Sequence, residues 1–329
     1  MPNWIGDAVM GLPVLQDISE KFPSCSVDVV CHKAIADLLE NNPYVSKKLV
    51  YSKKDSKKRE VIVSELKENH YDVGLLLTRS FSSALWFFQA RIPNRIGFKD
   101  HFRSLLLRPG LDIPKNEETE HQIITYKRLL EPLSIPISST MPKIYLQKEE
   151  IDLARKKLRE YNVPSDALIC GINPGAAYGS AKCWPPEHFK ALVLLLLQNP
   201  KVYVVFFGDD LSKDLVASIT SEFQTRVVNL AAKTTLRELM AYTSLCSCFV
   251  TNDSGPMHIA SSLGCNVVAI FGSTNSIKTG PYGNVKVVKH DVACAPCYLR
   301  KCPIDFRCMN KILANEVYTC VQEFLEKLE

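Results

Sequence analysis

The residues with the clearest chemical potential form the sequence TNDSGPMH at positions 251–258, between an apolar run and a run of small residues. Pro256 suits the first position of a helix, so Ser254 and Gly255 are expected at the helix start. Free backbone amides at a helix start bind anions, and phosphate fits them best. Asp253 precedes these amides, where a carboxylate could hold sugar hydroxyls. The alternative is a capped helix in which Asp253 and Ser254 only accept bonds from the amides, and spacing alone leaves both open.

A second candidate is the sequence NPGAAYGSAKCWP at positions 173–185. It also follows an apolar run, and it ends at two prolines that suit a helix start. The backbone around Gly175 and the ammonium group of Lys182 could together hold a diphosphate. The loop has neither the Gly-Lys-Ser/Thr of a Walker A motif nor the GxGxxG of dinucleotide-binding proteins. The alternative is an ordinary loop with a solvated lysine.

A third candidate is Asp7, which follows Gly6 at the start of a predicted helix. A carboxylate there could act as a general base, and the alternative is a helix N-cap without a catalytic role. Residues 1–7 have the composition of a loop, whereas a doubly wound domain normally opens with a strand. We therefore expect either a domain that lacks its first strand or a first strand encoded upstream of Met1.

Positive charge and aromatic residues gather in segment 79–108. Against the single acidic residue Asp100 stand six basic residues: Arg79, Arg91, Arg95, Lys99, Arg103 and Arg108. Aromatic residues such as Trp86 and Phe102 are interleaved with them. This composition suits an anionic, amphipathic partner such as a phosphorylated glycolipid. The alternative is a solvated basic face beside core aromatics, and the basic run 53–59 is expected to be a solvated helix start.

Four cysteines near the end of the chain form the pattern C-x2-C-x4-C-x5-C: Cys294, Cys297, Cys302 and Cys308. Four thiols at this spacing could bind a structural zinc ion. Reduced packing thiols and a pair of disulfides remain open as alternatives, and a catalytic metal is not expected. The other cysteines of the twelve are scattered, which fits a reducing compartment.

Short apolar runs alternate with helical patterns, which predicts an α/β fold with parallel sheets covered on both faces. Strands are predicted at 26–31, 73–78, 167–173, 202–208, 248–252 and 267–272. Helices are predicted, among other places, at 57–69, 149–161, 186–198, 235–245 and 314–327. Ligands bind parallel sheets at the carboxyl ends of the strands. Both anion-binding candidates lie at such ends, so we expect them in one site.

The length of 329 residues favours two domains, and the linker-like sequence SIPISSTMP at 134–142 separates them. We therefore expect domains at 1–145 and 146–329. A composition of 46% hydrophobic and 23% charged residues is ordinary for a globular protein, and a net charge of +5 does not suggest a nucleic-acid binder. The start lacks a basic leader, and the apolar run 191–197 is too short to span a bilayer. Membrane contact is therefore expected to be peripheral.

Taken together, the motifs resemble those of the lipopolysaccharide heptosyltransferases of glycosyltransferase family 9, and among them the heptosyltransferase II group. The resemblance covers nearly the whole chain. It rests on PNWIGDAVM at 2–10, SF at 80–81 with SAL at 83–85, IPNRIG at 92–97, PGA at 174–176 with AKCWP at 181–185, NDSGPMH at 252–258, FGST at 271–274 and the cysteine cluster. The chain departs from the family pattern at Arg79, Ser82 and Cys183, where asparagine, a basic residue and arginine are usual.

The resemblance implies a GT-B fold, in which two Rossmann-like domains face a cleft, with the acceptor on the first and the nucleotide sugar on the second. It implies ADP-L-glycero-D-manno-heptose as the donor and an inner-core heptose on Kdo–lipid A as the acceptor, in the cytoplasm at the inner face of the inner membrane. It places the catalytic base on Asp7, and donor binding on Gly175, Lys182, Asp253, Ser254, Gly255 and His258. Acceptor-side residues would be Gly6, Arg79, Arg95 and Arg103.

The expected reaction is an inverting single displacement that needs no cofactor. Asp7 would take the proton of the acceptor hydroxyl, while Lys182 and the helix start at Ser254 and Gly255 would stabilise the departing ADP. Two other functions remain as alternatives. One is a nucleotide-sugar 2-epimerase on the same fold, and the other is a catalytically inactive protein that binds a nucleotide sugar or a glycolipid.

Overall fold

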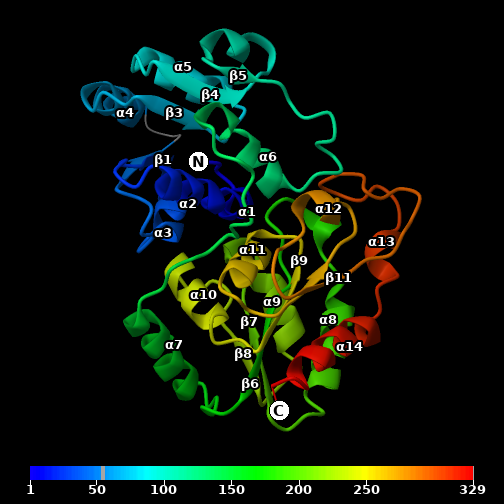
Figure 1. The fold of residues 1–329 in the computed structure, drawn as a ribbon. Helices are drawn as coiled ribbons and strands as arrows, with labels where there is room; N and C mark the ends of the chain where they lie inside the picture. Colours follow the sequence, from blue (N-terminus) through cyan, green and yellow to red (C-terminus); the bar gives the residue numbers. More distant parts are fainter. Residues whose placement is uncertain (53–55, 329) are drawn as a thin grey trace. The chain divides into compact units, whose positions relative to one another are not determined.

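A computed structural model describes residues 1–52 and 56–328 of the chain, with the side chains of residues 56–59 outside the description. The predicted solvated helix start at 53–59 therefore lies outside the described side chains. The chain divides into two compact units, Met1–Lys143 and Ile144–Glu329 (Figure 1). Among the described residues, no helix is both long enough and apolar enough to cross a membrane.

Unit 1 contains two small parallel sheets. Strand β1 (Asp28–His32) pairs with β2 (Lys47–Tyr51), and β3 (Val73–Leu76) pairs with β4 (Asn94–Phe98), which pairs with β5 (Gly110–Leu111). The helices in chain order are α1 (Ile5–Met10), α2 (Leu12–Lys21), α3 (Lys33–Leu38), α4 (Ser56–Glu68), α5 (Phe81–Gln89), the 3₁₀ helix η1 (His101–Leu106), α6 (Gln122–Arg128) and the 3₁₀ helix η2 (Glu131–Leu133). Residues 1–4 precede α1 without a strand, and the Met1 ammonium group donates to the Val30 carbonyl of β1 at 2.9 Å.

Unit 2 is built on one six-stranded parallel sheet with the order β11-β10-β9-β6-β7-β8. The strands in chain order are β6 (Leu168–Asn173), β7 (Val202–Phe206), β8 (Val227–Asn229), β9 (Cys248–Asn252), β10 (Val267–Ile270) and β11 (Val285–Val288). The chain starts in the middle at β6, builds β7 and β8 on one side, and then returns to build β9, β10 and β11 on the other. This order is that of a Rossmann fold, and it creates a topological switch point between β6 and β9.

Helices cover both faces of this sheet, as the alternation of apolar runs and helical patterns predicts (Figure 1). One face packs against α8 (Pro186–Leu196), α9 (Lys213–Thr220) and α14 (Ala314–Leu325), through residues such as Phe189 and Val321. The other packs against α7 (Lys148–Glu160), α10 (Leu236–Thr243) and α11 (Gly255–Ser262), through residues such as Leu158 and Met257. The remaining short helices are η3 (Ser180–Lys182), η4 (Asp210–Ser212), α12 (Ser276–Thr279) and α13 (Arg307–Asn310).

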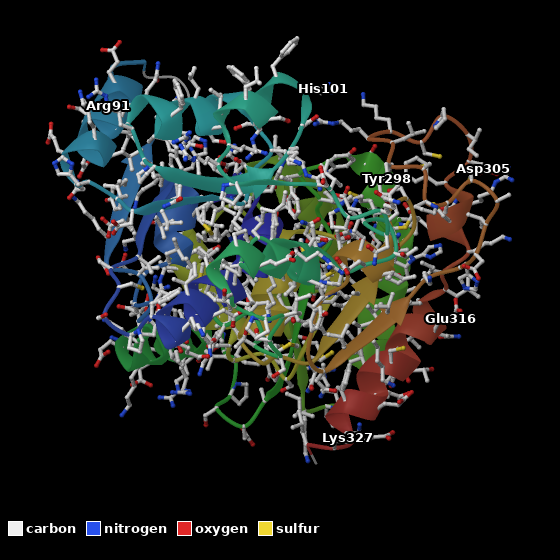
Figure 2. The ribbon with its side chains drawn as sticks, turned by 45° about the horizontal axis from the view of Figure 1, so that its top comes forward. Arg91, His101, Tyr298, Asp305, Glu316 and Lys327 are labelled. Carbon is white, nitrogen blue, oxygen red and sulfur yellow. The ribbon has the colours of Figure 1, made fainter. Side chains whose placement is uncertain are left out.

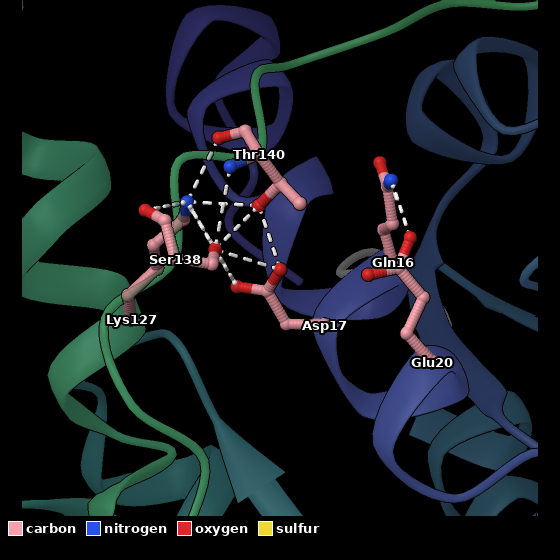
Figure 3. A network of polar contacts seen from close by, with 6 residues as sticks. All are labelled: Gln16, Asp17, Glu20, Lys127, Ser138 and Thr140. Carbon is pink, nitrogen blue, oxygen red and sulfur yellow. Dashed lines mark hydrogen bonds and ion pairs between the residues drawn. The ribbon is translucent and has the colours of Figure 1, made fainter.

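The segment that leaves unit 1 is fastened by a buried polar network (Figure 3). The Lys127 ammonium group donates to the carbonyl and hydroxyl oxygens of Ser138 and Thr140 at 2.7–2.9 Å. The Asp17 carboxylate accepts from both hydroxyls at 2.6–2.8 Å. In unit 2 the Ile144 amide donates to the Ser262 carbonyl at 3.3 Å. The chain is therefore attached to each unit within four residues of the boundary.

Candidate active site

Both sequence-predicted anion motifs lie at the switch point of the unit 2 sheet. The first follows β6, which ends at Asn173, and the second follows its neighbour β9, which ends at Asn252. The Asn252 side chain ties the first motif to β9, since its amide donates to the Pro174 carbonyl at 2.6 Å and its carbonyl accepts from the Trp184 amide at 3.1 Å. One asparagine therefore holds both ends of the loop that contains Lys182.

Two further features fix the shape of this loop. Trp184 is fully buried, and its indole N–H donates to the Ile312 carbonyl at 2.9 Å. At Gly175 the backbone passes so close to Ser212 that a Cβ atom would lie 2.1 Å from the serine hydroxyl oxygen. A side chain at Gly175 would therefore displace the loop. Lys182 projects from a loop that is held at both its beginning and its end.

Lys182 and Asp253 form the central pair of the site, with Nζ and Oδ2 2.6 Å apart. The same carboxylate oxygen accepts from the Thr274 hydroxyl at 2.6 Å. The Lys182 ammonium group also lies 5.0 Å from the centre of the Tyr178 ring, within the range of a cation–π contact. The structure therefore joins a cation from the first motif to a carboxylate from the second.

The start of α11 lacks a capping bond from its N-cap side chain. Its N-cap residue, Ser254, makes no side-chain capping bond, because its hydroxyl interacts with the Thr251 hydroxyl at 3.1 Å and accepts from the Asn173 side chain at 3.4 Å. The alternative in which Asp253 and Ser254 only cap the helix is therefore wrong. Gly255 begins the helix, and the Ser254 side chain caps none of its first-turn amides. The predicted donor residue His258 lies on the same helix and is buried.

Asp7 belongs to the first turn of α1 in unit 1 and is half-buried. The N-cap of this helix is Trp4, so the alternative of Asp7 as an N-cap is wrong. Burial raises the pKa of the nearby Tyr126 phenol well above its ordinary value, and the Asp7 charge raises it further. Glu117 acts on this phenol in the same direction and Arg79 in the opposite one, so their charges also lie close to it.

The arginines predicted for the acceptor side have different partners. Arg79 forms a two-pronged ion pair with Glu117 and is partly exposed. Arg95 donates to the Leu106 carbonyl at 2.7 Å and also to the Ile92 and Pro93 carbonyls.

Arg103 is buried, and its guanidinium group donates to the Phe98 carbonyl at 2.6 Å and the Thr78 carbonyl at 2.7 Å. These two carbonyls lie where β4 ends and shortly after β3 ends. The contacts favour a structural role for Arg103, and for the carbonyl-bound Arg95 as well. Gly6, the remaining acceptor-side candidate, lies beside Asp7 in α1.

The four clustered cysteines are free thiols. Within the described ranges, no three His, Cys, Asp or Glu side chains are arranged to bind a metal ion. Burial raises the pKa of the Cys308 thiol, and the other three cysteines add to this increase, which places them in its neighbourhood. Of the four, Cys308 is buried, Cys297 and Cys302 are half-buried, and Cys294 is exposed.

Sequence reasoning missed two members of the site, Thr274 and Tyr178. Thr274 follows β10, which pairs with β9, so it lies beyond the carboxyl end of a strand beside the one that carries Asp253. That position could have indicated Thr274 as a site residue. Tyr178 lies inside the predicted loop, but its contact with Lys182 depends on how the loop folds.

Comparisons with known proteins identify the family of the chain. The sequence model of glycosyltransferase family 9 (heptosyltransferase) matches residues 59–306. The chain is 27% identical to lipooligosaccharide heptosyltransferase 2 of Campylobacter jejuni over 323 residues, which cover 96% of this chain and 95% of that one. It is 28% identical to lipopolysaccharide heptosyltransferase 2 of Salmonella typhimurium over 294 residues, covering 85% and 83% of the two chains.

Solved structures show the same fold. The structure of E. coli ADP-heptose lipopolysaccharide heptosyltransferase II matches with a TM-score of 0.85 and 24% identity, over 99% of this chain and 97% of that one. A family 9 glycosyltransferase from Veillonella parvula matches with a TM-score of 0.87 and 20% identity, over 99% and 96%. The predicted GT-B class, with two Rossmann-like domains, is thereby confirmed. Since the family model spans most of the sequence, this chain belongs to glycosyltransferase family 9 and is a glycosyltransferase.

Proposed function

We propose that this chain transfers L-glycero-D-manno-heptose from ADP-heptose to a heptose of the lipopolysaccharide inner core. The observation that carries the proposal is the pairing of Lys182 with Asp253 beside the uncapped start of α11, at the switch point of the sheet. A cation and open amides suit a diphosphate, and an adjacent carboxylate suits sugar hydroxyls. Family membership and the heptosyltransferase relatives support this function over the epimerase and the inactive binding protein.

On the donor side, Lys182 and the amides at Ser254 and Gly255 bind the diphosphate. Lys182 can do so while paired, because an ammonium group has three N–H donors and Asp253 uses one of them. Asp253 orients the sugar, and the backbone at Gly175 and the buried His258 support the same pocket. Lys182 and the two amides donate hydrogen bonds to the leaving diphosphate, and the proposed reaction uses no divalent metal ion.

The chemical step is an inverting displacement. The acceptor hydroxyl oxygen forms a bond to the anomeric carbon of the heptose as the bond from that carbon to the diphosphate oxygen breaks. ADP leaves with the electron pair of the broken bond, and the hydroxyl proton passes to the Asp7 carboxylate. Arg79 and Gly6 lie near Asp7 in unit 1 and are the residues we assign to the acceptor.

The protein works in the cytoplasm, in peripheral contact with the inner face of the inner membrane. Unit 1 supports this contact through apolar side chains that face solvent at and near η1, where Phe102 is 80% and Leu105 is 82% exposed. Exposed basic residues lie close in sequence, including Arg91 after α5 (Figure 2). Apolar side chains beside positive charge suit an anionic bilayer surface.

The test is mass spectrometry of heptose transfer from ADP-heptose to a panel of truncated core acceptors. We expect one heptose to be added by the wild type, with undiminished activity in EDTA. The Asp7→Asn variant keeps the size of the side chain and removes the base, so kcat should fall by about 10²–10⁴ while ADP binding is retained. Absence of transfer to every acceptor, or equal kcat in the Asp7→Asn variant, would contradict the proposal.

A further inference from the structure

The segment between β11 and α13, which contains Cys294, Cys297 and Cys302, lies against the loop of Lys182. The Ala181 amide donates to the Arg300 carbonyl at 3.1 Å, and the Tyr178 hydroxyl donates to the Tyr298 carbonyl at 2.8 Å. At Gly179 a Cβ atom would lie 2.2 Å from the Arg300 carbonyl oxygen, so only glycine permits this approach. Tyr298 is labelled on this segment in Figure 2.

The segment is also fastened to the sheet edge that forms the site. The amides of Cys297 and Tyr298 both donate to the Ser273 carbonyl, at 3.1 and 2.8 Å. Ser273 is buried and precedes Thr274, which contacts the Asp253 carboxylate. The cysteine-bearing segment therefore has backbone contacts with two of the loops that build the donor site.

This arrangement places a second cation beside Lys182. The Arg300 guanidinium carbon lies 5.1 Å from the centre of the Tyr178 ring, and the Lys182 ammonium group lies 5.0 Å from the same centre. The two charges share one ring, so their separation is at most the sum of these distances. That separation is comparable to the Debye length of about 8 Å at physiological ionic strength, so both can act on one bound anion.

The positive charges of Lys182 and Arg300 differ in whether a carboxylate already balances them. The charge of Lys182 is balanced by Asp253, whereas in the described part of the chain the Arg300 guanidinium group forms no ion pair and is exposed to solvent. A diphosphate that meets only the Lys182–Asp253 pair meets no net positive charge. Arg300 supplies that charge, and a guanidinium group can bind phosphate oxygens in a two-pronged manner.

We propose that Arg300 binds the diphosphate of the nucleotide sugar, and that the cysteine-bearing segment serves to hold this arginine over the Lys182 loop. The inference rests on the proposed function, because it concerns the same donor site. The competing explanation is that Arg300 only packs on Tyr178 at the surface.

The test is titration calorimetry of the full-length protein with ADP and, in parallel, with adenosine. The Arg300→Ala variant should bind ADP about ten-fold more weakly, the usual effect of one charge-assisted hydrogen bond, and should bind adenosine as the wild type does. Arg300→Lys should recover part of the loss. Lys301→Ala is the matched control, since it removes the same charge from the adjacent exposed position and should leave ADP affinity within about two-fold.

A second variant tests the shared ring. Tyr178→Leu should weaken ADP binding through both cations, whereas Tyr178→Phe keeps the ring and should have a smaller effect. Equal ADP affinity of Arg300→Ala and wild type would overturn this inference alone, as would an equal loss in Lys301→Ala. Failure of the wild type to bind ADP would overturn the proposed function together with it.

Discussion

In each unit a lysine pairs with an aspartate, and the two pairs differ in burial and in how many hydrogen-bond acceptors the lysine contacts. In unit 1, Lys127 and Asp17 are both 1% exposed, and the lysine already contacts four oxygen atoms of Ser138 and Thr140 (Figure 3). In unit 2, Lys182 is 14% exposed and bonds directly to Asp253, with spare N–H donors. We call the Lys127 pair saturated, because all N–H donors of its buried ammonium group have acceptors within the protein, and such a lysine stabilises the fold. We call the Lys182 pair unsaturated, because its ammonium group has N–H donors left to bind a ligand at the carboxyl ends of the strands.

The largest effect should come from breaking the saturated pair. Lys127→Met leaves the Asp17 carboxylate buried without its cation, so the free energy of unfolding should fall by about 3–5 kcal/mol. Urea unfolding of the full chain measures this loss. The double variant Lys127→Met/Asp17→Leu should recover part of it, because no buried charge is then left unpaired. An unchanged unfolding midpoint in Lys127→Met would show that this pair does not stabilise the fold.

The unsaturated pair should respond in the opposite way. Lys182→Met should lower kcat by about 10²–10³, because the leaving diphosphate loses a preorganised donor. The unfolding midpoint should fall less than in Lys127→Met, because the Lys182–Asp253 pair is more exposed to solvent. Steady-state transfer assays with ADP-heptose measure the first effect and urea unfolding the second. Lys190→Met, which removes a surface lysine paired with Glu222, is the control. The distinction between the two pairs would be contradicted if Lys182→Met had the same unfolding midpoint as Lys127→Met and the same kcat as the wild type.

A third ion pair, which is partly exposed, should have a smaller effect on stability than the Lys127–Asp17 pair. Arg237 of α10 binds Glu150 of α7, and this bond lowers the pKa of the Glu150 carboxyl below its ordinary value of 4.5. A carboxyl group with a lowered pKa in the folded state adds stability above its ordinary pKa, and that stability is lost as the pH falls through the folded value.

Glu150→Gln should therefore reduce the free energy of unfolding by about 1 kcal/mol at neutral pH. The difference from the wild type should shrink as the pH is lowered from 4.5 through the folded pKa. Urea unfolding between pH 7 and pH 3.5 measures it. If the stability difference between the wild type and Glu150→Gln grew as the pH was lowered, the ion pair would not stabilise the fold in the way described.

In the unit 2 sheet, the sequence predicted the buried strands well and the edge strands poorly. Strands β6, β7, β9 and β10 are nearly continuous apolar runs because helices cover both of their faces, and all four were expected. Strand β11 lies at one edge of the unit 2 sheet, includes the half-buried Lys286, and was missed. In unit 1 the edge strands β1 and β3 were expected, whereas β2, β4 and β5 were missed. Strand β8, at the other edge of the unit 2 sheet, has only three residues.

For the candidate site, sequence could identify the motifs but not the pairs that they form. The Lys182–Asp253 contact joins residues 71 positions apart, so it depends on the strand order. Arg103 lies in a basic, aromatic segment whose composition suggested ligand binding, yet its buried guanidinium group donates to the Phe98 and Thr78 carbonyls. Lys127 gave no signal, since its partner Asp17 lies on another helix. Residue types and spacing do not show which polar groups are already satisfied inside the fold.

The connecting segment has contacts with each unit close to the boundary between them. Thr140 is fixed to unit 1 by Lys127 and Asp17, while Ile144 and Tyr145 are fixed to unit 2 through Ser262 and Arg237. Only positions 141–143 lie between these attachments, and Pro142 fixes one of their few backbone torsions. Few backbone torsions therefore lie between these attachments, so ordering this stretch of chain costs little conformational entropy.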